Sequence, residues 1–181
     1  MRIGLTGTMS VGKTTLVEAL KESDKFTFYK FATERSQFLS DLGIPLNTDS
    51  TLKGQTVFLA ERCAELINEN IITDRTIIDV LAFTFEANSI SFRNKKAFER
   101  YAQRFIKEYD YIFYIPMDGV LLEDNGVRCV DKEYRDKIDF TIKRMIRDHG
   151  LEAKNIISIP PHLTVEERVT FIEKNTSTSY L

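Results

Sequence analysis

The chain has 181 residues, enough to bury a full hydrophobic core, and we expect a single domain spanning residues 1–181. Its formal net charge of −2 gives no overall attraction to nucleic acid or to an anionic membrane, so neither partner is favoured. The apolar runs are far too short to span a membrane, no secretory leader precedes the first predicted strand, and the two cysteines have no metal-ligand spacing. We therefore expect a cytoplasmic protein with reduced thiols.

Hydrophobic periodicity switches along the chain between a strand-like and a helix-like pattern. In chain order it predicts a strand at 2–6, a helix at 13–22, a strand at 26–31, a helix at 52–70, a strand at 71–74, helices near 76–88 and 97–108, a strand at 109–116, a polar loop, a helix at 134–149, a strand at 155–160 and a helix at 163–174. The last residues, 175–181, are expected to fray. Strands that alternate with helices predict an α/β fold, in which a sheet of five parallel strands is covered by helices on both faces.

Two further expectations concern the placement of charged residues. In the helix at 52–70 the charged residues are expected to face mostly away from the core: Glu61, Arg62, Glu65 and Glu69. In a parallel sheet the ligand binds at the carboxyl ends of the strands. These ends fall after residue 6 and near residues 34, 74 and 117, and chemically reactive or charged side chains follow three of them.

The turn after residue 6 carries a phosphate-loop motif. Gly7, four residues and then Gly12-Lys13-Thr14 fit the pattern G-x-x-x-x-G-K-[ST] between a strand and a helix. A plain tight turn with an incidental lysine would need only one glycine and a capping residue. The motif predicts that backbone N–H groups cradle the phosphates of ATP, that Lys13 spans their β and γ oxygens and that the Thr14 hydroxyl binds Mg²⁺. The residues expected to bind the triphosphate are Gly7, Thr8, Met9, Ser10, Val11, Gly12, Lys13, Thr14 and Thr15.

The phosphate loop is part of a wider family resemblance. The stretches GTMSVGKTT, TDRT and YDYIFYIP…EDNGVRCVDKEYRDKID resemble the small P-loop nucleoside and nucleotide kinases. The nearest likeness is to the kinase domain of the nicotinamide riboside kinase type, and a looser one is to the deoxynucleoside and thymidylate kinases. The resemblance implies the P-loop NTPase fold, with a lid segment at about residues 118–136. It also implies an ATP- and Mg²⁺-dependent kinase that phosphorylates a small nucleoside or nucleotide.

The resemblance and the chemistry together assign roles at the other strand ends. Asp74 is expected to hold Mg²⁺ together with Thr14, and Arg75 to offset charge on the donor or the acceptor. The alternative is that Asp74 caps the helix that begins near Ile77.

At the second strand end, Glu34 is expected to face the acceptor hydroxyl as phosphorus is attacked. Arg35 becomes the more useful group if the acceptor is a monophosphate, and Glu34 then matters less as a base. An ordinary exposed pair at the start of a helix is the alternative.

In the loop EDNGVRCVDKEYRD, Arg128 and Arg135 could close over the phosphates and exclude water. A solvated helix face with pairs such as Asp139–Lys143 explains the later basic residues at least as well. The residues expected to act in catalysis are therefore Lys13, Glu34, Asp74, Arg75 and Arg128.

Two other functions remain as alternatives to a small-molecule kinase. A nucleotide-dependent regulatory ATPase or GTPase shares the phosphate loop, but a GTPase switch normally carries N-K-x-D, and Asn94-Lys95-Lys96-Ala97 lacks its aspartate. A kinase of polynucleotides would need a basic groove. The residues leave open the acceptor, the choice between ATP and GTP, and the oligomeric state, although the helices at 52–70 and 97–109 could pair with a second copy.

Overall fold

The computed structural model of the protein describes residues 1–33, 35–117, 132–149 and 155–177. Within these residues a five-stranded parallel sheet has the strand order β2-β3-β1-β4-β5. The strands are β1 (Arg2–Thr6), β2 (Lys30–Ala32), β3 (Ile71–Asp74), β4 (Tyr111–Tyr114) and β5 (Ile156–Ser158). The central strand β1 places Leu5 opposite both Asp74 of β3 and Phe113 of β4. The predicted α/β fold with five parallel strands is confirmed.

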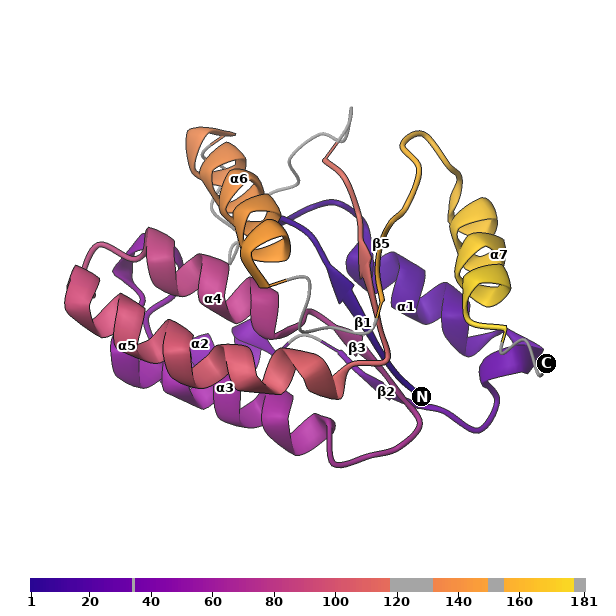
Figure 1. Cartoon of the computed structure of the whole chain (residues 1–181), viewed down its shortest axis with the longest axis horizontal. Coiled ribbons are helices and arrows are strands. Elements are labelled where there is room, and N and C mark those ends of the chain that lie inside the picture. Colours follow the sequence, from indigo (N-terminus) through magenta and orange to yellow (C-terminus); the bar gives the residue numbers. More distant parts are fainter. Residues whose placement is uncertain (34, 118–131, 150–154, 178–181) are drawn as a thin grey trace.

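Helices cover both faces of this sheet, as Figure 1 shows. The helices are α1 (Lys13–Lys21), α2 (Ser36–Asp41), α3 (Leu52–Glu65), α4 (Ile77–Glu86), α5 (Phe92–Ala102), α6 (Lys132–His149) and α7 (Val165–Asn175). Helices α1 and α7 lie on one face, and α3, α4, α5 and α6 lie on the other. None of the helices in the described ranges is long and apolar enough to cross a membrane.

Each face of the sheet has its own hydrophobic core, because neighbouring side chains of a strand point to opposite faces. On β4, Phe113 packs in the core with α1 and α7, whereas Ile112 packs in the core with α3 to α6. Leu16 of α1 and Ile172 of α7 belong to the first core, and both are fully buried. Apolar contacts with the sheet and with α7 therefore hold α1, the helix that follows the phosphate-loop motif, in place. Its first turn lies at the carboxyl edge of the sheet.

The predicted strand at 26–31 is wrong over its first half. Residues Asp24–Phe26 form a 3₁₀ turn, which the Ser23 side chain caps by accepting a hydrogen bond from the backbone N–H of Lys25. Phe26 is fully buried, but Phe28 is 90% exposed. The alternation of aromatic and polar residues therefore arises from a turn, and extended pairing with β3 begins only at Lys30.

The predicted helix at 97–108 begins earlier and ends earlier than its aromatic stripe indicates. Ser91 caps α5 by accepting a hydrogen bond from the backbone N–H of Asn94, so the helix begins at Phe92. It ends at Ala102, and a 3₁₀ segment, Gln103–Glu108, leads into β4. At the C-terminus Asn175 ends α7, and Thr176 is buried with its N–H bonded to the carbonyl of Ile172, so the expected fraying does not include these two residues.

Candidate phosphate-binding site

The loop between β1 and α1 has a backbone that only glycine adopts easily at two positions. Gly7 has φ 151° and Gly12 has φ 84°. A Cβ atom on Gly7 would lie 2.7 Å from the backbone carbonyl oxygen of Ile115, which is too close for any side chain. Ser10, at φ 58°, also occupies the left-handed region. The two motif glycines are thus required by the path of the loop.

The first turn of α1 is an uncapped positive end. The N-cap residue is Gly12, and no side chain within the described ranges caps it. Residues 13 to 16 include no acidic side chain that would neutralise the helix dipole. Backbone N–H groups that lack a partner at a helix N-terminus attract anions. This end of α1 is suited to a phosphate group.

Lys13 places its ammonium group inside the loop. Its side chain is buried, and Nζ donates hydrogen bonds of 2.7 Å to the carbonyl oxygens of Gly7 and Thr8. The charge is therefore held at the loop by two backbone acceptors. An ammonium group in this place can exchange a carbonyl partner for a phosphate oxygen without leaving the loop.

Thr14 and Asp74 meet across two strand ends. The Thr14 hydroxyl donates a hydrogen bond of 2.6 Å to Oδ2 of Asp74. Asp74 is 1% exposed, and its other oxygen, Oδ1, is buried and has no hydrogen-bond partner among the described residues. A hydroxyl beside a carboxylate with a spare oxygen is a donor set that fits Mg²⁺, which takes one or two protein oxygens plus phosphates and water. No cluster of three or more His, Cys, Asp and Glu side chains able to hold a metal occurs in the described part of the chain.

A buried carboxylate, Asp79, links the loop to the turn after β3. Its Oδ1 accepts a hydrogen bond of 3.3 Å from the backbone N–H of Gly7, and its Oδ2 accepts bonds from the N–H (2.7 Å) and hydroxyl (2.9 Å) of Thr76. The residue is fully buried on the first turn of α4. Asp79 was not among the predicted site residues, although T-I-I-D is a capping-box pattern that marks the start of a helix.

Arg62 supports Asp74 from below, and its predicted outward orientation is wrong. The side chain is 3% exposed, and its guanidinium donates to the backbone carbonyl of Asp74 (2.9 Å) and to Glu65 (2.6 Å). Burial raises the pKa of Glu65 to about 7, although the charge of Arg62 opposes this rise. No periodic pattern reveals this role, because the partner carbonyl lies on another element.

Arg75 follows Asp74 at a strained backbone position. Its φ of 83° lies in the left-handed region, and its N–H bonds to the carbonyl of Leu5 at 3.0 Å. The guanidinium lies over the ring of Phe83, 4.8 Å from its centre. A non-glycine residue in this conformation costs on the order of 1–3 kcal/mol and persists only where its surroundings enforce it.

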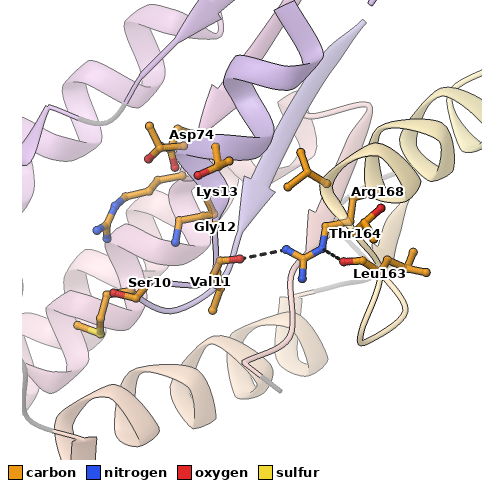
Figure 2. A pocket seen from close by; sticks show the side chains of 13 residues that line it. Ser10, Val11, Gly12, Lys13, Asp74, Leu163, Thr164 and Arg168 are labelled. Carbon is orange, nitrogen blue, oxygen red and sulfur yellow. Dashed lines mark hydrogen bonds between the residues drawn. The ribbon is translucent and has the colours of Figure 1, made fainter. Parts of the chain in front are cut away.

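Several of these residues line a cavity of about 390 Å³ (Figure 2). Its lining consists of residues 9–15 of the loop, Asp74 and Arg75, and a C-terminal group, which is Leu163, Thr164, Val165 and Arg168. The loop and the pair after β3 were predicted from the sequence, but the C-terminal group was not. Arg168 is the charged member of that group, and Figure 2 shows it reaching from α7 toward Val11.

Two predicted site residues lie elsewhere, and two fall outside the described part of the chain. Arg35 does not line this cavity; it pairs with Glu61 at 3.1 Å and stacks on the ring of Phe38 at 4.2 Å. Arg135 is buried on α6 and also does not line it, although its backbone carbonyl accepts a hydrogen bond of 3.1 Å from the Thr8 hydroxyl. Glu34 and Arg128 lie outside the described residues, as does the predicted lid up to residue 131.

Solved structures of several kinases resemble the fold. Deoxyadenosine kinase from M. mycoides with bound dCTP is 17% identical, with a TM-score of 0.67 over 97% of this chain and 98% of that one. Thymidylate kinase from Candida albicans is 15% identical, with a TM-score of 0.70 over 96% and 89%. The NadR protein in complex with NR is 17% identical, with a TM-score of 0.72 over 96% of this chain and 50% of that one. At such identities the likeness establishes the fold, and the predicted P-loop NTPase fold is confirmed.

At the sequence level, no curated protein matches the chain. The family model of the AAA domain, however, matches residues 2–168. This span runs from β1 through the phosphate loop to Arg168 on α7. The chain therefore belongs to the AAA domain family, with the phosphate loop and the five-stranded parallel sheet of a P-loop NTPase.

Proposed function

We propose that the protein is a kinase that uses ATP and Mg²⁺ to phosphorylate a small acceptor, a (deoxy)nucleoside or a (deoxy)nucleoside monophosphate. The observation that carries the proposal is the contact between Thr14 and Asp74, together with Oδ1 of Asp74, which has no hydrogen-bond partner among the residues that the structure describes. The resemblance in the sequence motifs supports the kinase class. The likeness to solved kinases supports it at the level of the fold.

In this proposal the donor triphosphate lies along the cavity. Its β- and γ-phosphates accept hydrogen bonds from the loop N–H groups and from the first turn of α1, and Lys13 moves its two carbonyl bonds to phosphate oxygens. The nucleoside end extends toward residues 163–165, because the cavity continues there beyond the loop. Thr14 and Asp74 would hold Mg²⁺, which offsets phosphate charge during transfer.

The acceptor is proposed to approach from the ends of β2 and β3. Arg75 offsets the charge that spreads over the transferred group, and Glu34 accepts the hydrogen bond of the attacking hydroxyl. Arg35 has Glu61 as its partner. It can exchange this carboxylate for the phosphate of a monophosphate acceptor, which favours a fork of charged hydrogen bonds. Arg128 and Arg135 complete the proposal as groups that exclude water when the donor is bound.

An acceptor screen tests this function. Purified protein is incubated with Mg²⁺ and γ-labelled ATP or GTP, and with nucleosides, nucleoside monophosphates, nicotinamide riboside or a 5′-hydroxyl oligonucleotide in turn. Transfer of label to a nucleoside or monophosphate is the expected result. Label that appears only as inorganic phosphate, at a rate that no acceptor changes, would support the regulatory ATPase or GTPase, and label on the oligonucleotide would support a polynucleotide kinase.

A further inference from the structure

Arg168 joins the last helix to the phosphate loop. Its Nη1 donates a hydrogen bond of 3.1 Å to the carbonyl oxygen of Val11, and its Nε donates one of 3.1 Å to the carbonyl oxygen of Leu163 (Figure 2). The first bond spans 157 residues of sequence and the second spans five. One guanidinium therefore connects the loop that faces the phosphates to the segment that forms the far wall of the cavity.

The carbonyl of Val11 is a sensitive point of the loop. It directly precedes Gly12, whose φ of 84° turns the chain into α1. A loop that binds phosphate must present N–H groups, and a carbonyl oxygen that rotates toward the anion repels it. Arg168 holds this peptide unit in one orientation and offsets the negative end of its dipole. The carbonyls of Gly7 and Thr8 are held in a comparable way by Lys13.

The planar guanidinium suits this task better than an ammonium group would. Its Nε and Nη1 donate to two different carbonyls in a fixed geometry, whereas an ammonium group is a compact charge on a flexible stem. The side chain is half-buried, and its Nη1 lies 3.6 Å from the position that a Cβ on Gly12 would occupy. The guanidinium therefore lies directly beside the Val11–Gly12 peptide.

We propose that Arg168 is a positioning residue, which fixes the Val11–Gly12 peptide of the phosphate loop against the wall at residues 163–165 and thereby sets the affinity of the loop for polyphosphate. This inference rests on the proposed function, because it requires the loop to bind a nucleoside triphosphate. It adds a residue from the C-terminal helix that acts through the loop rather than by touching the reacting atoms.

Binding of two probes to three variants tests the inference. The probes are MgATP and magnesium tripolyphosphate, which has no base or ribose, and their dissociation constants are measured by calorimetry. R168Q removes the charge and the paired donors, R168K keeps the charge with one nitrogen, and K174Q removes a charge from the exposed end of the same helix. R168Q should raise the dissociation constants of both probes by about tenfold or more, the order expected for losing a hydrogen bond from a charged donor. R168K should bind both probes clearly more weakly than wild type does, and K174Q should bind them as tightly as wild type does.

The two probes separate an effect on phosphate binding from a contact with the nucleoside. Normal tripolyphosphate binding by R168Q would overturn the inference, whether or not ATP binding falls, because a contact made only with the nucleoside would not affect a probe that lacks one. Full recovery by R168K would also overturn it, since charge alone would then suffice. If R168Q does not fold, R168K by itself decides. Wild-type protein that binds neither probe would contradict the proposed function as well, whereas wild-type binding with unaffected variants contradicts the role of Arg168 alone.

Hydrogen exchange adds a readout that a merely structural role would not move. In R168Q the backbone amides of residues 9–13 should exchange faster than in wild type, whereas those of residues 169–175 in α7 should keep their protection. Faster exchange throughout α7 with an unchanged loop would show that Arg168 only stabilises its own helix, and would overturn the inference.

Discussion

The Thr14 hydroxyl donates a hydrogen bond of 2.6 Å to the carboxylate of Asp74, a residue 60 positions further along the chain. The contact joins the start of α1 to the end of β3, and these two segments meet because β1 and β3 are neighbours in the sheet. A metal ion bound here would take the place of this hydrogen bond, because the Thr14 hydroxyl and the Asp74 carboxylate would then both coordinate the same cation. The pair should therefore act as one unit in catalysis.

A double-mutant cycle tests this unit. T14V and D74N each remove one proposed Mg²⁺ ligand, and each should lower turnover and raise the Mg²⁺ concentration needed for half-maximal rate. Because either change disrupts the same site, the double variant should be little worse than the more damaged single variant. T14S keeps the hydroxyl and should restore most of the rate. Strictly additive effects would show that the two side chains do not share a metal.

Lys13 gives the most direct test of the phosphate loop. K13M keeps the stem of the side chain but removes the ammonium group that bonds to Gly7 and Thr8. Turnover should fall by about a hundredfold or more, because a preorganised charge on the transferring phosphate is lost, while circular dichroism should show a folded protein. K21M is the matched control, since Lys21 lies at the exposed end of the same helix and pairs with Glu18. Near-normal turnover by K13M would refute the loop's role.

Asp79 should matter far more for stability than its exposed counterpart. Capping boxes occur at Thr76–Asp79 on α4 and at Thr164–Glu167 on α7. D79A leaves the buried N–H groups of Gly7 and Thr76 without an acceptor and should lower the free energy of unfolding by about 1–3 kcal/mol. E167A leaves the N–H of Thr164 to bond with water and should lower the free energy of unfolding by less than about 0.5 kcal/mol. Urea unfolding compares the two, and equal losses would mean that Asp79 is only a helix cap.

Glu65 should make stability depend on pH. Its carboxyl has a pKa of about 7 in the folded protein, against 4.5 for the ordinary group, and burial is the main cause. Between these values the folded protein holds this proton more tightly than the unfolded chain does, so the contribution to the free energy of unfolding falls as pH rises from about 4.5 to about 7. E65Q should remove this decline in urea unfolding measured across the range. E69Q, at an exposed position nearby, should keep it, and parallel pH profiles for E65Q and wild type would contradict the assignment.

The parts of the site that follow local rules could be predicted from the sequence. The spacing of Gly7, Gly12 and Lys13 encodes the loop, since its backbone demands glycine at fixed positions. Asp74 and Arg75 could be placed beside it because carboxyl ends of parallel strands share one edge of a sheet. The alternation of hydrophobic periods predicted the five strands. In FTFYKF, however, the same alternation also occurs in a turn that Ser23 caps, so the predicted strand began too early.

The supporting residues could not be predicted, because their roles are set by partners far away in the sequence. The sequence predicts Arg62 to be an exposed charge on a helix, because nothing in it indicates the hydrogen bond to the carbonyl of Asp74. Arg168 reads as an ordinary residue of an amphipathic helix, and its contact with Val11 exists only because α7 packs beside α1. Side-chain-to-backbone bonds of this kind leave no periodic trace, so a single sequence does not reveal them.

The pairing of the sheet also has a consequence for how the protein is synthesised. Strand β1 bonds to β3 and β4, and both of these neighbours leave the ribosome after β1 and its loop. A nascent chain that ends before residue 71 contains the entire phosphate loop but neither of the neighbours that hold β1. Such pairing between distant segments forms late, and it leaves apolar strands exposed in the meantime. Nucleotide should therefore assist folding only after β4 has emerged. Truncated products that end earlier should be bound by chaperones and cleaved by proteases, and they should not bind ATP.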